Sequence, residues 1–335
     1  MNTRLLEVED LHVEFRTRQG RVRAVRGLSY QVDRGESLGL VGESGSGKSV
    51  SALAVLGLLP RSASVTAGRI RFQGRDLVGL PERQLRAIRG RSMALIFQDP
   101  LSSLNPVLTI GRQITEQLRA HHIATGRAAR DRAVELLERV GIADAARRIG
   151  QYPHQLSGGM RQRAMVAMAL SCGPSLLIAD EPTTALDVTI QAQVLELLAE
   201  LRATTEMSML LITHDLGVVA GSTDRLAVMY AGRIVEDGAT AEVLARPEHP
   251  YTAGLVESVP RLDAPRGAAL HTIPGAPPDL GTELPGCAFR PRCPHPAPQA
   301  QSQEPALREL RPGHRVACWS PRLTPLQDTT SGGNP

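Results

Sequence analysis

A short apolar run followed by a glycine-rich turn constrains the fold of this chain more than any other feature. The run, at residues 37–41, is SLGLV, and the turn after it, at residues 42–49, is GESGSGKS. The turn matches the phosphate-binding pattern G-x-x-x-x-G-K-[ST], which lies between a strand and a helix. Backbone N–H groups of such a loop surround phosphate oxygens, and the helix N-terminus adds a favourable dipole. The sequence therefore predicts an α/β fold that binds a nucleotide.

The distribution of basic residues supports this interpretation. The chain holds 38 Lys and Arg residues, and only one of them, Lys48, is a lysine. It stands where the loop needs a slender point charge to reach the β- and γ-phosphates, a task for which the planar fork of Arg is no substitute. A chance glycine-rich turn would not explain that placement. The residues of this loop that we expect to bind the nucleotide are Gly42, Ser44, Gly45, Ser46, Gly47, Lys48 and Ser49, the last also as a Mg²⁺ ligand.

Composition and charge exclude several other classes of protein. With 42% hydrophobic residues the chain can form a large core, so disorder is excluded as its main state. The net charge is +4 and the arginines are scattered among acidic residues, which disfavours nucleic acid as a partner. The longest apolar stretch, residues 52–59, is far shorter than the roughly 20 residues of a membrane-spanning helix. Because the N-terminus also lacks the pattern of a secretory signal, we expect a cytoplasmic protein.

Two further apolar runs end in polar residues. Residues 176–179 are followed by Asp180 and Glu181, and residues 209–212 are followed closely by His214. Runs without alternation suit strands buried on both faces of a parallel sheet, and ligands bind at the carboxyl edge of such a sheet. There Asp180 would hold Mg²⁺, Glu181 would orient and deprotonate water, and His214 would contact a γ-phosphate. The alternative is that the carboxylate pair only caps a helix.

The remaining parts of the chain differ in pattern. Apolar residues between 133 and 140 follow the spacing of one helix face, so we expect a helical segment at about 98–165. After residue 260 the composition changes, because 14 of the 24 prolines fall in the last 75 residues. Proline breaks helices and removes hydrogen-bond donors, which predicts a small irregular extension at 261–327 that adds nothing to the sheet. The polar segment 328–335 is expected to be a disordered tail.

A second anion-binding element lies at residues 156–160, LSGGM. A serine and two glycines that open a helix form a site for phosphate oxygens. Since the chain already has one phosphate loop, this element would serve the nucleotide of another subunit. At this point the sequence resembles the ATP-binding cassette (ABC) family, whose nucleotide-binding domains dimerise head to tail. In that dimer two ATP molecules lie between each phosphate loop and the opposite signature, here Ser157, Gly158 and Gly159.

The resemblance covers about 200 residues and implies further roles. Phe15 would stack on adenine, Gln98 would be the Q-loop residue that also helps to hold Mg²⁺, and 185–187 with Asp187 would be the D-loop. His214 would be the switch histidine. The catalytic set implied is Glu181, His214, Lys48 and Gln98, with Mg²⁺ on Ser49, Gln98 and Asp180. The fold implied for residues 1–260 is a P-loop NTPase core of RecA-like α/β type with an antiparallel β part and a helical subdomain.

Two segments resemble one particular group within the ABC family. Residues 98–106, QDPLSSLNP, and 249–252, HPYT, look like the ATPase subunits of dipeptide and oligopeptide permeases, although the second could be a simple turn. These importers imply ATP-driven peptide transport at the cytoplasmic face of the membrane. The implied partners are a second ATPase subunit, identical or related, two membrane subunits that dock on 98–150, and an external binding protein.

Rival functions fit the sequence less well. Nickel importers share much of the same pattern, so nickel or another small solute is the alternative cargo. A soluble ABC ATPase acting on chromosomes would carry long coiled coils between the phosphate loop and the signature, whereas the chain from Lys48 to Ser157 has no sustained heptads. Ribosome-type members carry two cassettes, and this chain has one. A small-molecule kinase would not explain the signature.

The extension holds three of the four cysteines, Cys287, Cys293 and Cys318. Permease ATPases of this type often end in a four-cysteine pattern that can hold an iron–sulfur cluster, but here the third position falls near Ala300. Three thiolates could form a zinc site with His295 or His314, or hold a cluster incompletely. The alternative is that the thiols pack as small apolar groups without a metal.

Overall fold

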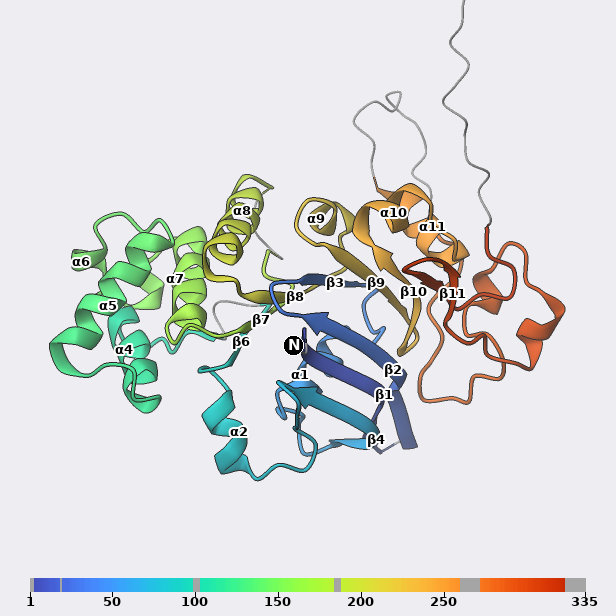
Figure 1. Cartoon of the computed structure of the whole chain (residues 1–335), viewed down its shortest axis with the longest axis horizontal. Coiled ribbons are helices and arrows are strands. Elements are labelled where there is room, and N and C mark those ends of the chain that lie inside the picture. The colour runs from blue at the N-terminus through green and yellow to red at the C-terminus, as the bar shows by residue number, and fades with distance from the viewer. Residues whose placement is uncertain (1–2, 19, 99–102, 184–187, 260–271, 323–335) are drawn as a thin grey trace, which may run out of the picture.

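The protein contains two sheets joined by helices, and one sheet extends across most of the molecule (Figure 1). The computed structural model describes residues 3–18, 20–98, 103–183, 188–259 and 272–322. In these ranges the larger sheet has the strand order β11-β12-β10-β9-β3-β8-β7-β6. Its strands are β3 (Ser37–Val41), β6 (Met93–Ile96), β7 (Leu176–Asp180), β8 (Ser208–Thr213), β9 (Arg225–Tyr230), β10 (Arg233–Ala239), β11 (Arg308–Arg311) and β12 (His314–Val316).

The centre of this sheet is parallel and fully buried, as the apolar runs predicted. β3 pairs in parallel with β8 and β9, and β7 pairs in parallel with β8 and β6. Every residue of β3 and β8 is buried. In the register Val41 lies opposite Thr213 and Asp180 opposite Ile212, so the carboxyl ends of three strands meet at one edge.

The second sheet is antiparallel and lies over helix α1 (Lys48–Val55). Its strand order is β2-β1-β4-β5, with β1 (Arg4–Thr17), β2 (Gly20–Asp33), β4 (Ala63–Phe72) and β5 (Arg75–Asp76). Apolar residues that alternate along β1 form one hydrophobic core with α1 and with one face of the parallel sheet. This arrangement holds the helix that follows the phosphate loop between two sheets.

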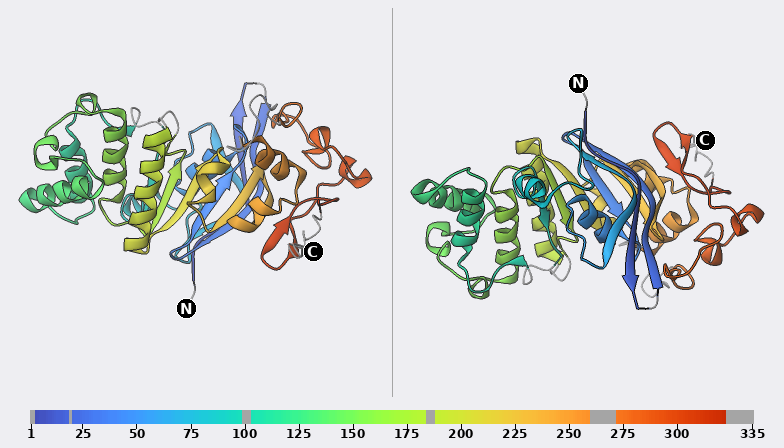
Figure 2. Two further views of the ribbon diagram at one scale, coloured as in Figure 1. Left: turned by 90° about the horizontal axis from the view of Figure 1, so that it is seen from above. Right: turned by 90° about the horizontal axis from the view of Figure 1, so that it is seen from below.

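A group of helices lies at the end of the molecule opposite the C-terminal extension (Figures 1 and 2). It consists of α4 (Ile110–Ala120), α5 (Gly126–Arg139), α6 (Ala145–Arg148) and the first turns of α7 (Gly158–Leu170). Ile114 and Leu118 of α4 are buried with Ala133 and Leu137 of α5 in the same core. These helices lie mainly within residues 98–165, where a helical segment was expected.

The other helices cover the parallel sheet or lie beside it. They are α2 (Glu82–Ile88), α8 (Val188–Thr205), α9 (Leu216–Ala220), α10 (Thr240–Ala245) and α11 (Pro250–Ser258), with short 3₁₀ turns at Pro153–Gln155, Arg290–Arg292 and Pro298–Gln301. None of the helices in the described part of the chain is both long and apolar enough to cross a bilayer.

The extension continues the parallel sheet, and here the expectation from sequence was wrong. β12 pairs antiparallel with β10, and β11 pairs antiparallel with β12, so a C-terminal hairpin becomes the edge of the larger sheet. The many prolines of this segment had argued against strands in it. Pro312, however, lies between the two strands and not inside either of them, so it does not interrupt a strand. Gly313 follows it with φ of 73°, the left-handed conformation that a tight turn favours. The expected tail 328–335 and the boundary near 260 lie outside the described residues.

Charged pairs attach the hairpin to the sheet. His314 and Glu236 are fully buried, and their side chains are 2.7 Å apart. The Glu236 carboxylate raises the pKa of His314 and also accepts hydrogen bonds from the backbone N–H groups of Glu248 and His249 at 2.8 and 2.9 Å. Glu236 thus has three hydrogen-bonded partners, His314 and the two backbone N–H groups, and these offset the cost of burying its charge.

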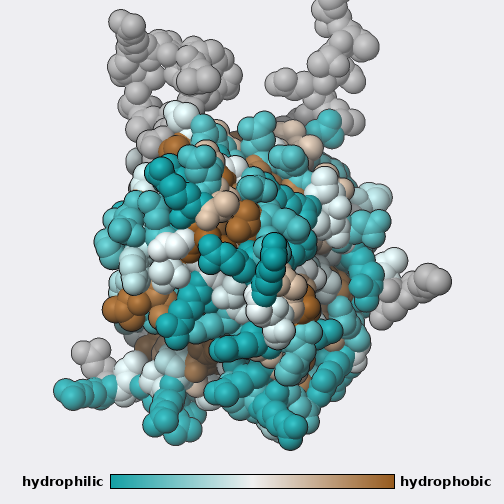
Figure 3. All heavy atoms as spheres, turned by 90° about the vertical axis from the view of Figure 1, so that its left-hand side faces the viewer, coloured by the Kyte–Doolittle hydropathy of each residue, from teal (hydrophilic) through white to brown (hydrophobic). Residues whose placement is uncertain are grey.

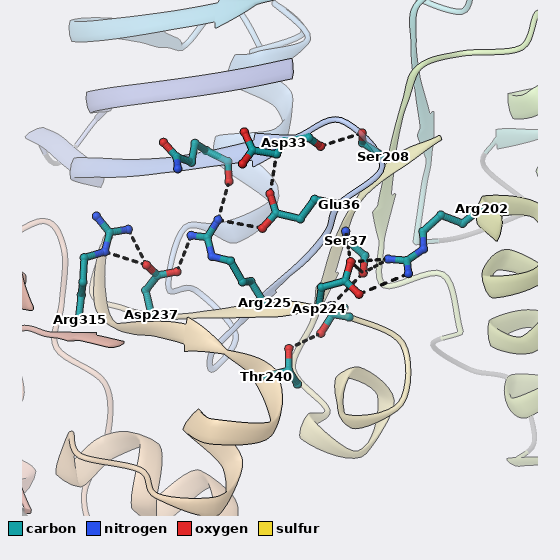
Figure 4. A network of polar contacts seen from close by, with 12 residues as sticks. Asp33, Glu36, Ser37, Arg202, Ser208, Asp224, Arg225, Asp237, Thr240 and Arg315 are labelled. Atoms are coloured by element: carbon teal, nitrogen blue, oxygen red, sulfur yellow. Dashed lines mark hydrogen bonds and ion pairs between the residues drawn. The ribbon is translucent and has the colours of Figure 1, made fainter. Parts of the chain in front are cut away.

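A polar network connects residues at the amino-terminal edge of the sheet, which is opposite the carboxyl edge described above (Figure 4). Asp237 of β10 lies between Arg225 at 2.9 Å and Arg315 of the hairpin, and Arg225 also contacts Glu36 at 2.9 Å. Nearby, Asp224 accepts hydrogen bonds from the backbone N–H of Ser37 and from Arg202. The network fixes the loops at the amino edge and leaves the carboxyl edge as the side on which a ligand can bind.

Candidate nucleotide site

The phosphate loop connects β3 to α1 and surrounds the single lysine. Lys48 is only 5% exposed, and its Nζ donates hydrogen bonds to the backbone oxygens of Gly42 at 2.7 Å and Glu43 at 3.0 Å. Burial lowers the pKa of Lys48, while the carboxylates of Glu181, Asp180 and Glu43 oppose that shift. The ammonium group therefore lies directly beneath the loop at the carboxyl edge of the sheet.

Two glycines of the loop are required by close packing. A Cβ at Gly42 would lie 2.1 Å from the backbone oxygen of Met229, and a Cβ at Gly47 would lie 2.3 Å from that of Ala24. Gly47 also has φ of 101°, which L-residues rarely adopt. The loop thus packs against β9 on one side and β2 on the other, which fixes its path.

The acidic residues predicted to act at the carboxyl edge lie beside other residues of the predicted site. Ser49 Oγ donates to Asp180 Oδ1 at 3.0 Å. Glu181 accepts a hydrogen bond from Gln98 Nε2 at 2.8 Å and contacts His214 Nδ1 at 3.0 Å. Five residues from four separated segments therefore meet at one place, at the ends of β6, β7 and β8 and the start of α1.

The environment of the two carboxylates differs. Burial raises the pKa of Asp180, and the hydrogen bond from Ser49 opposes that shift. Glu181 has φ of 48°, a left-handed conformation that is uncommon for a residue with a side chain, and such strain is concentrated at functional sites. Its carboxylate is 12% exposed, whereas the His214 side chain is 53% exposed. Glu181 is thus held in a fixed position next to a histidine that solvent can reach.

The oxygen atoms of Ser49 and Asp180 fit a magnesium ion, because Mg²⁺ takes hydroxyl and carboxylate ligands and keeps several waters. In this conformation the amide nitrogen of Gln98 faces Glu181, so the expected role of Gln98 at the metal stays a prediction.

The signature residues begin helix α7. Ser157 is the N-cap, and its Oγ accepts a hydrogen bond from the backbone N–H of Met160 at 3.3 Å. Ser157 and Gly158 are exposed, and a Cβ at Gly158 would meet no atom within 4 Å. This helix start therefore presents an open surface to another molecule. Asp187 and the rest of the D-loop at 185–187 lie outside the described residues.

Phe15 lies in β1, opposite Val22 of β2 and Ala63 of β4, and is partly buried. Replacing Phe15 by Ala is expected to weaken ATP binding by about 1 to 3 kcal/mol, the range of base–aromatic contacts, if its ring stacks on adenine. Titration with ATP measures the Kd. Tyr152→Ala, which removes an exposed ring elsewhere in the chain, serves as the control, and an unchanged Kd in Phe15→Ala would make Phe15 only a packing residue of the sheet.

Two contacts to the phosphate loop were not predicted from the sequence. The Glu43 carboxylate pairs with Arg292 of the extension at 2.7 and 2.9 Å, and the Glu43 backbone N–H donates to the hydroxyl of Tyr251 at 2.8 Å. Tyr251 belongs to residues 249–252, which are the start of α11 rather than a simple turn. His249 Nδ1 caps that helix by accepting from the Tyr251 N–H at 3.0 Å, and Pro250 is its first residue.

The cysteines of the extension are half-buried, and burial raises the pKa of Cys287, Cys293 and Cys318, the last to about 11. Ala300, at the place of the missing cysteine, accepts a hydrogen bond from the Cys287 N–H at 2.8 Å. His314 contacts Glu236 instead of a thiol. Within the described ranges, no group of three or more His, Cys, Asp and Glu side chains is placed to hold a metal ion. The described residues thus show no zinc site of the three cysteines with His295 or with His314, and zinc binding there stays a prediction.

Comparison with known proteins agrees with this geometry. The family model described as ABC transporter matches residues 25–184, and the model described as the C-terminal region of oligopeptide/dipeptide transporters matches residues 235–299. Among solved structures, the dimeric ATP-binding cassette MJ0796 bound to ADP and Pi superposes with a TM-score of 0.64 at 25% identity, covering 70% of this chain and 99% of that one. CbiO1 from Clostridium perfringens has a TM-score of 0.61 at 28% identity, covering 73% and 92%.

Curated relatives are more similar still. The dipeptide transport ATP-binding protein DppD of Bacillus subtilis is 51% identical over 94% of both chains. The oligopeptide transport ATP-binding protein OppD of the same organism is 50% identical over 95% of this chain and 89% of its own length. The OppD of Mycobacterium tuberculosis is 52% identical over 94% of this chain and 51% of its own length. With this identity along nearly its whole length, the chain belongs to the family of ABC transporter ATP-binding proteins, in the branch of the dipeptide and oligopeptide transport subunits.

Proposed function

We propose that this chain is the ATP-hydrolysing subunit that powers import of dipeptides or oligopeptides through a binding-protein-dependent ABC transporter. The observation that carries the proposal is the position of Glu181 between Gln98 and His214, next to the Lys48 loop. Such a site needs little covalent chemistry from the protein, because phosphoryl transfer is catalysed by positioning and by charge. The names of the relatives and the match of the C-terminal region support peptides as the cargo.

Each residue has a defined task in this proposal. Lys48 and the loop N–H groups would bind the β- and γ-phosphates, and Ser49 and Asp180 would hold Mg²⁺, which would supply positive charge and orient the phosphates. Glu181 orients the attacking water and takes its proton. His214, in contact with Glu181 at 3.0 Å, reaches toward the γ-phosphate and keeps the carboxylate in place. Gln98 holds the other carboxylate oxygen and joins the site to the helical segment.

A second ATPase subunit completes the site. The exposed start of α7 offers Ser157 and the N–H groups after it to a phosphate of the opposite subunit. ATP would then favour the closed dimer because it binds that form more tightly, and hydrolysis would release it. The dimeric cassette MJ0796 supports this arrangement, and the second subunit can be a copy of this chain or a relative.

The membrane subunits would dock on the helical segment, which places the chain peripherally at the cytoplasmic face. That end of the molecule is largely hydrophilic with a few separate hydrophobic areas (Figure 3). Val107, which follows the Q-loop, is 74% exposed, and Ile123 is 43% exposed. Contact of the membrane subunits with this segment would be coupled to the position of Glu181 through Gln98, which donates a hydrogen bond to that carboxylate.

Reconstitution of the transporter in vesicles tests this function. The chain is co-expressed with its membrane subunits, purified with them from membranes, and assayed for ATP hydrolysis with peptide-loaded binding protein. We expect stimulation by peptides and none by nickel. Stimulation by nickel alone would favour the alternative cargo, and a chain that never associates with membrane subunits would contradict the transport function.

The cysteines give a separate prediction. Because the extension holds three cysteines, with Ala300 at the place of the fourth, and a four-iron cluster normally uses four thiolates, we expect the anaerobically purified protein to lack a complete cluster. Metal analysis and the visible spectrum measure this, and Ala300→Cys is the matched variant that restores the fourth thiol. About four irons per wild-type chain with a brown chromophore would contradict the expectation.

A further inference from the structure

The C-terminal extension contacts the phosphate loop through a buried ion pair. Arg292 Nη1 lies 2.7 Å from Glu43 Oε2, and Arg292 Nη2 lies 2.9 Å from Glu43 Oε1. Glu43 is the first variable residue of the loop pattern, and the two residues are 249 positions apart in the chain. The Arg292 side chain is 4% exposed and that of Glu43 is 26% exposed. Two parallel hydrogen bonds of this kind fix direction as well as distance.

Arg292 is itself held in position from several sides. Its Nε donates to the backbone oxygen of Pro274 at 2.9 Å. The guanidinium carbon lies 5.8 Å from the centre of the Tyr230 ring and 6.0 Å from that of Phe289. These contacts replace the water that Arg292 loses on burial, so the guanidinium meets the loop in a fixed orientation.

Tyr251 holds the same loop residue by its backbone. Its hydroxyl accepts the Glu43 N–H at 2.8 Å, and the residue is fully buried. Burial raises the pKa of Tyr251, so the hydroxyl stays protonated. Both the backbone and the side chain of Glu43 are therefore held, by α11 and by the extension that follows it.

The charge of Glu43 explains why such restraint matters. A triphosphate carries several negative charges, and a carboxylate on the loop that binds it is unfavourable unless it is neutralised. Glu43 also acts electrostatically on Lys48, the residue that must bind phosphate. The ion pair with Arg292 supplies a matching positive charge and turns the carboxylate toward the extension.

A separate contact joins the extension to the adenine side of the site. The backbone N–H of Arg23 in β2 donates to the backbone oxygen of Leu280 at 3.1 Å. Val22, the neighbour of Arg23, lies directly opposite Phe15 in β1. The extension thus touches the hairpin that carries Phe15 as well as the phosphate loop.

We propose that the C-terminal extension is a working part of the nucleotide site, in which Arg292 is a positioning residue that neutralises Glu43 and fixes the phosphate loop. This inference rests on the proposed use of ATP by the site. Arg292 acts through Glu43 and does not touch the nucleotide. The extension therefore contributes to ATP affinity in addition to completing the sheet.

The test compares charge variants of the pair in the full-length protein, using the Kd for Mg·ATP and steady-state hydrolysis. Arg292→Gln should raise the Kd and the KM for ATP about tenfold with a smaller change in kcat, because an unpaired carboxylate then faces the triphosphate. Glu43→Gln should bind ATP as tightly as the wild type or more tightly. The double variant should recover to within about threefold of the wild type, since no free charge remains.

Arg315→Gln is the matched control. It breaks another ion pair between the extension and the sheet, while Asp237 keeps its partner Arg225 at 2.9 Å. We expect this variant to lose thermal stability without a change in Kd. An equal Kd in Arg292→Gln and Arg315→Gln would overturn the proposal, as would a double variant that binds no better than Arg292→Gln.

The test stays decisive under three outcomes. If Arg292→Gln does not fold, Glu43→Gln remains informative, because a merely structural ion pair predicts weaker ATP binding and the proposal predicts equal or tighter binding. If the wild-type protein binds no ATP, the proposed function fails with the inference. If the wild type binds ATP and Arg292→Gln binds it equally well, only the inference fails.

Discussion

Replacing Glu181 by Gln is expected to lower ATP hydrolysis by about 10² to 10⁴-fold while the Kd for Mg·ATP stays within a few-fold of the wild type. The amide keeps the size of the side chain and can still meet His214 at 3.0 Å and Gln98 at 2.8 Å. It cannot take a proton from water. The loss therefore falls on kcat, since the contacts that bind the phosphates are unchanged.

Single-turnover hydrolysis and equilibrium ATP binding measure the two effects separately. Glu138→Gln, at an exposed position of α5, is the control for loss of one carboxylate. Wild-type turnover by Glu181→Gln would remove Glu181 from the chemistry. An equal loss of ATP affinity and hydrolysis would instead assign it to binding.

Replacing Lys48 by Met is expected to raise the Kd for ATP by about 10² to 10³-fold and to abolish measurable hydrolysis. The reason is that the Lys48 ammonium is the positive charge that the loop places next to the bound phosphates. Lys48→Arg is expected to lose nearly as much ATP affinity and hydrolysis. The ammonium fits between the backbone oxygens of Gly42 and Glu43 at 2.7 and 3.0 Å, and a planar guanidinium has neither that shape nor that reach.

Arg83→Lys, at an exposed position of α2, controls for exchange between the two basic residue types. We expect it to match the wild type in ATP binding. If Lys48→Arg bound ATP within about twofold of the wild type, charge alone would suffice at this position, and the argument from the single lysine would be wrong.

The sequence predicted the carboxyl edge of the sheet because its signals are local. A strand buried on both faces shows as an unbroken apolar run, and the register of parallel neighbours brings the residues after such runs together. Asp180, Glu181 and His214 could thus be placed at one edge before the structure was known. Gln98 came from the resemblance, although it too follows an apolar run, at residues 93–97, and Ser157 came from a serine and two glycines at the start of a helix.

The contacts of the extension could not be predicted in this way. Glu43 occupies a position that the loop pattern leaves variable, and its partner Arg292 is one of many arginines in a proline-rich segment. The β11–β12 hairpin joins β10 through two residue pairs, Asp237 with Arg315 and Glu236 with Val316, that lie far apart in the chain, and only Pro312 and Gly313 mark its turn. Pairings between distant segments depend on the folded surface rather than on local sequence, which is why these were missed.

The hairpin also protects the edge of the larger sheet from self-association. Without β12, strand β10 would present a row of unpaired N–H and C=O groups, which is a template for edge-to-edge aggregation. The new outermost strand, β11, is only four residues long, and Arg308, Glu309 and Arg311 make it highly charged. Short, charged edges discourage strand addition by a second chain. A cassette truncated near residue 260 would lose this protection, so its solubility depends on the extension.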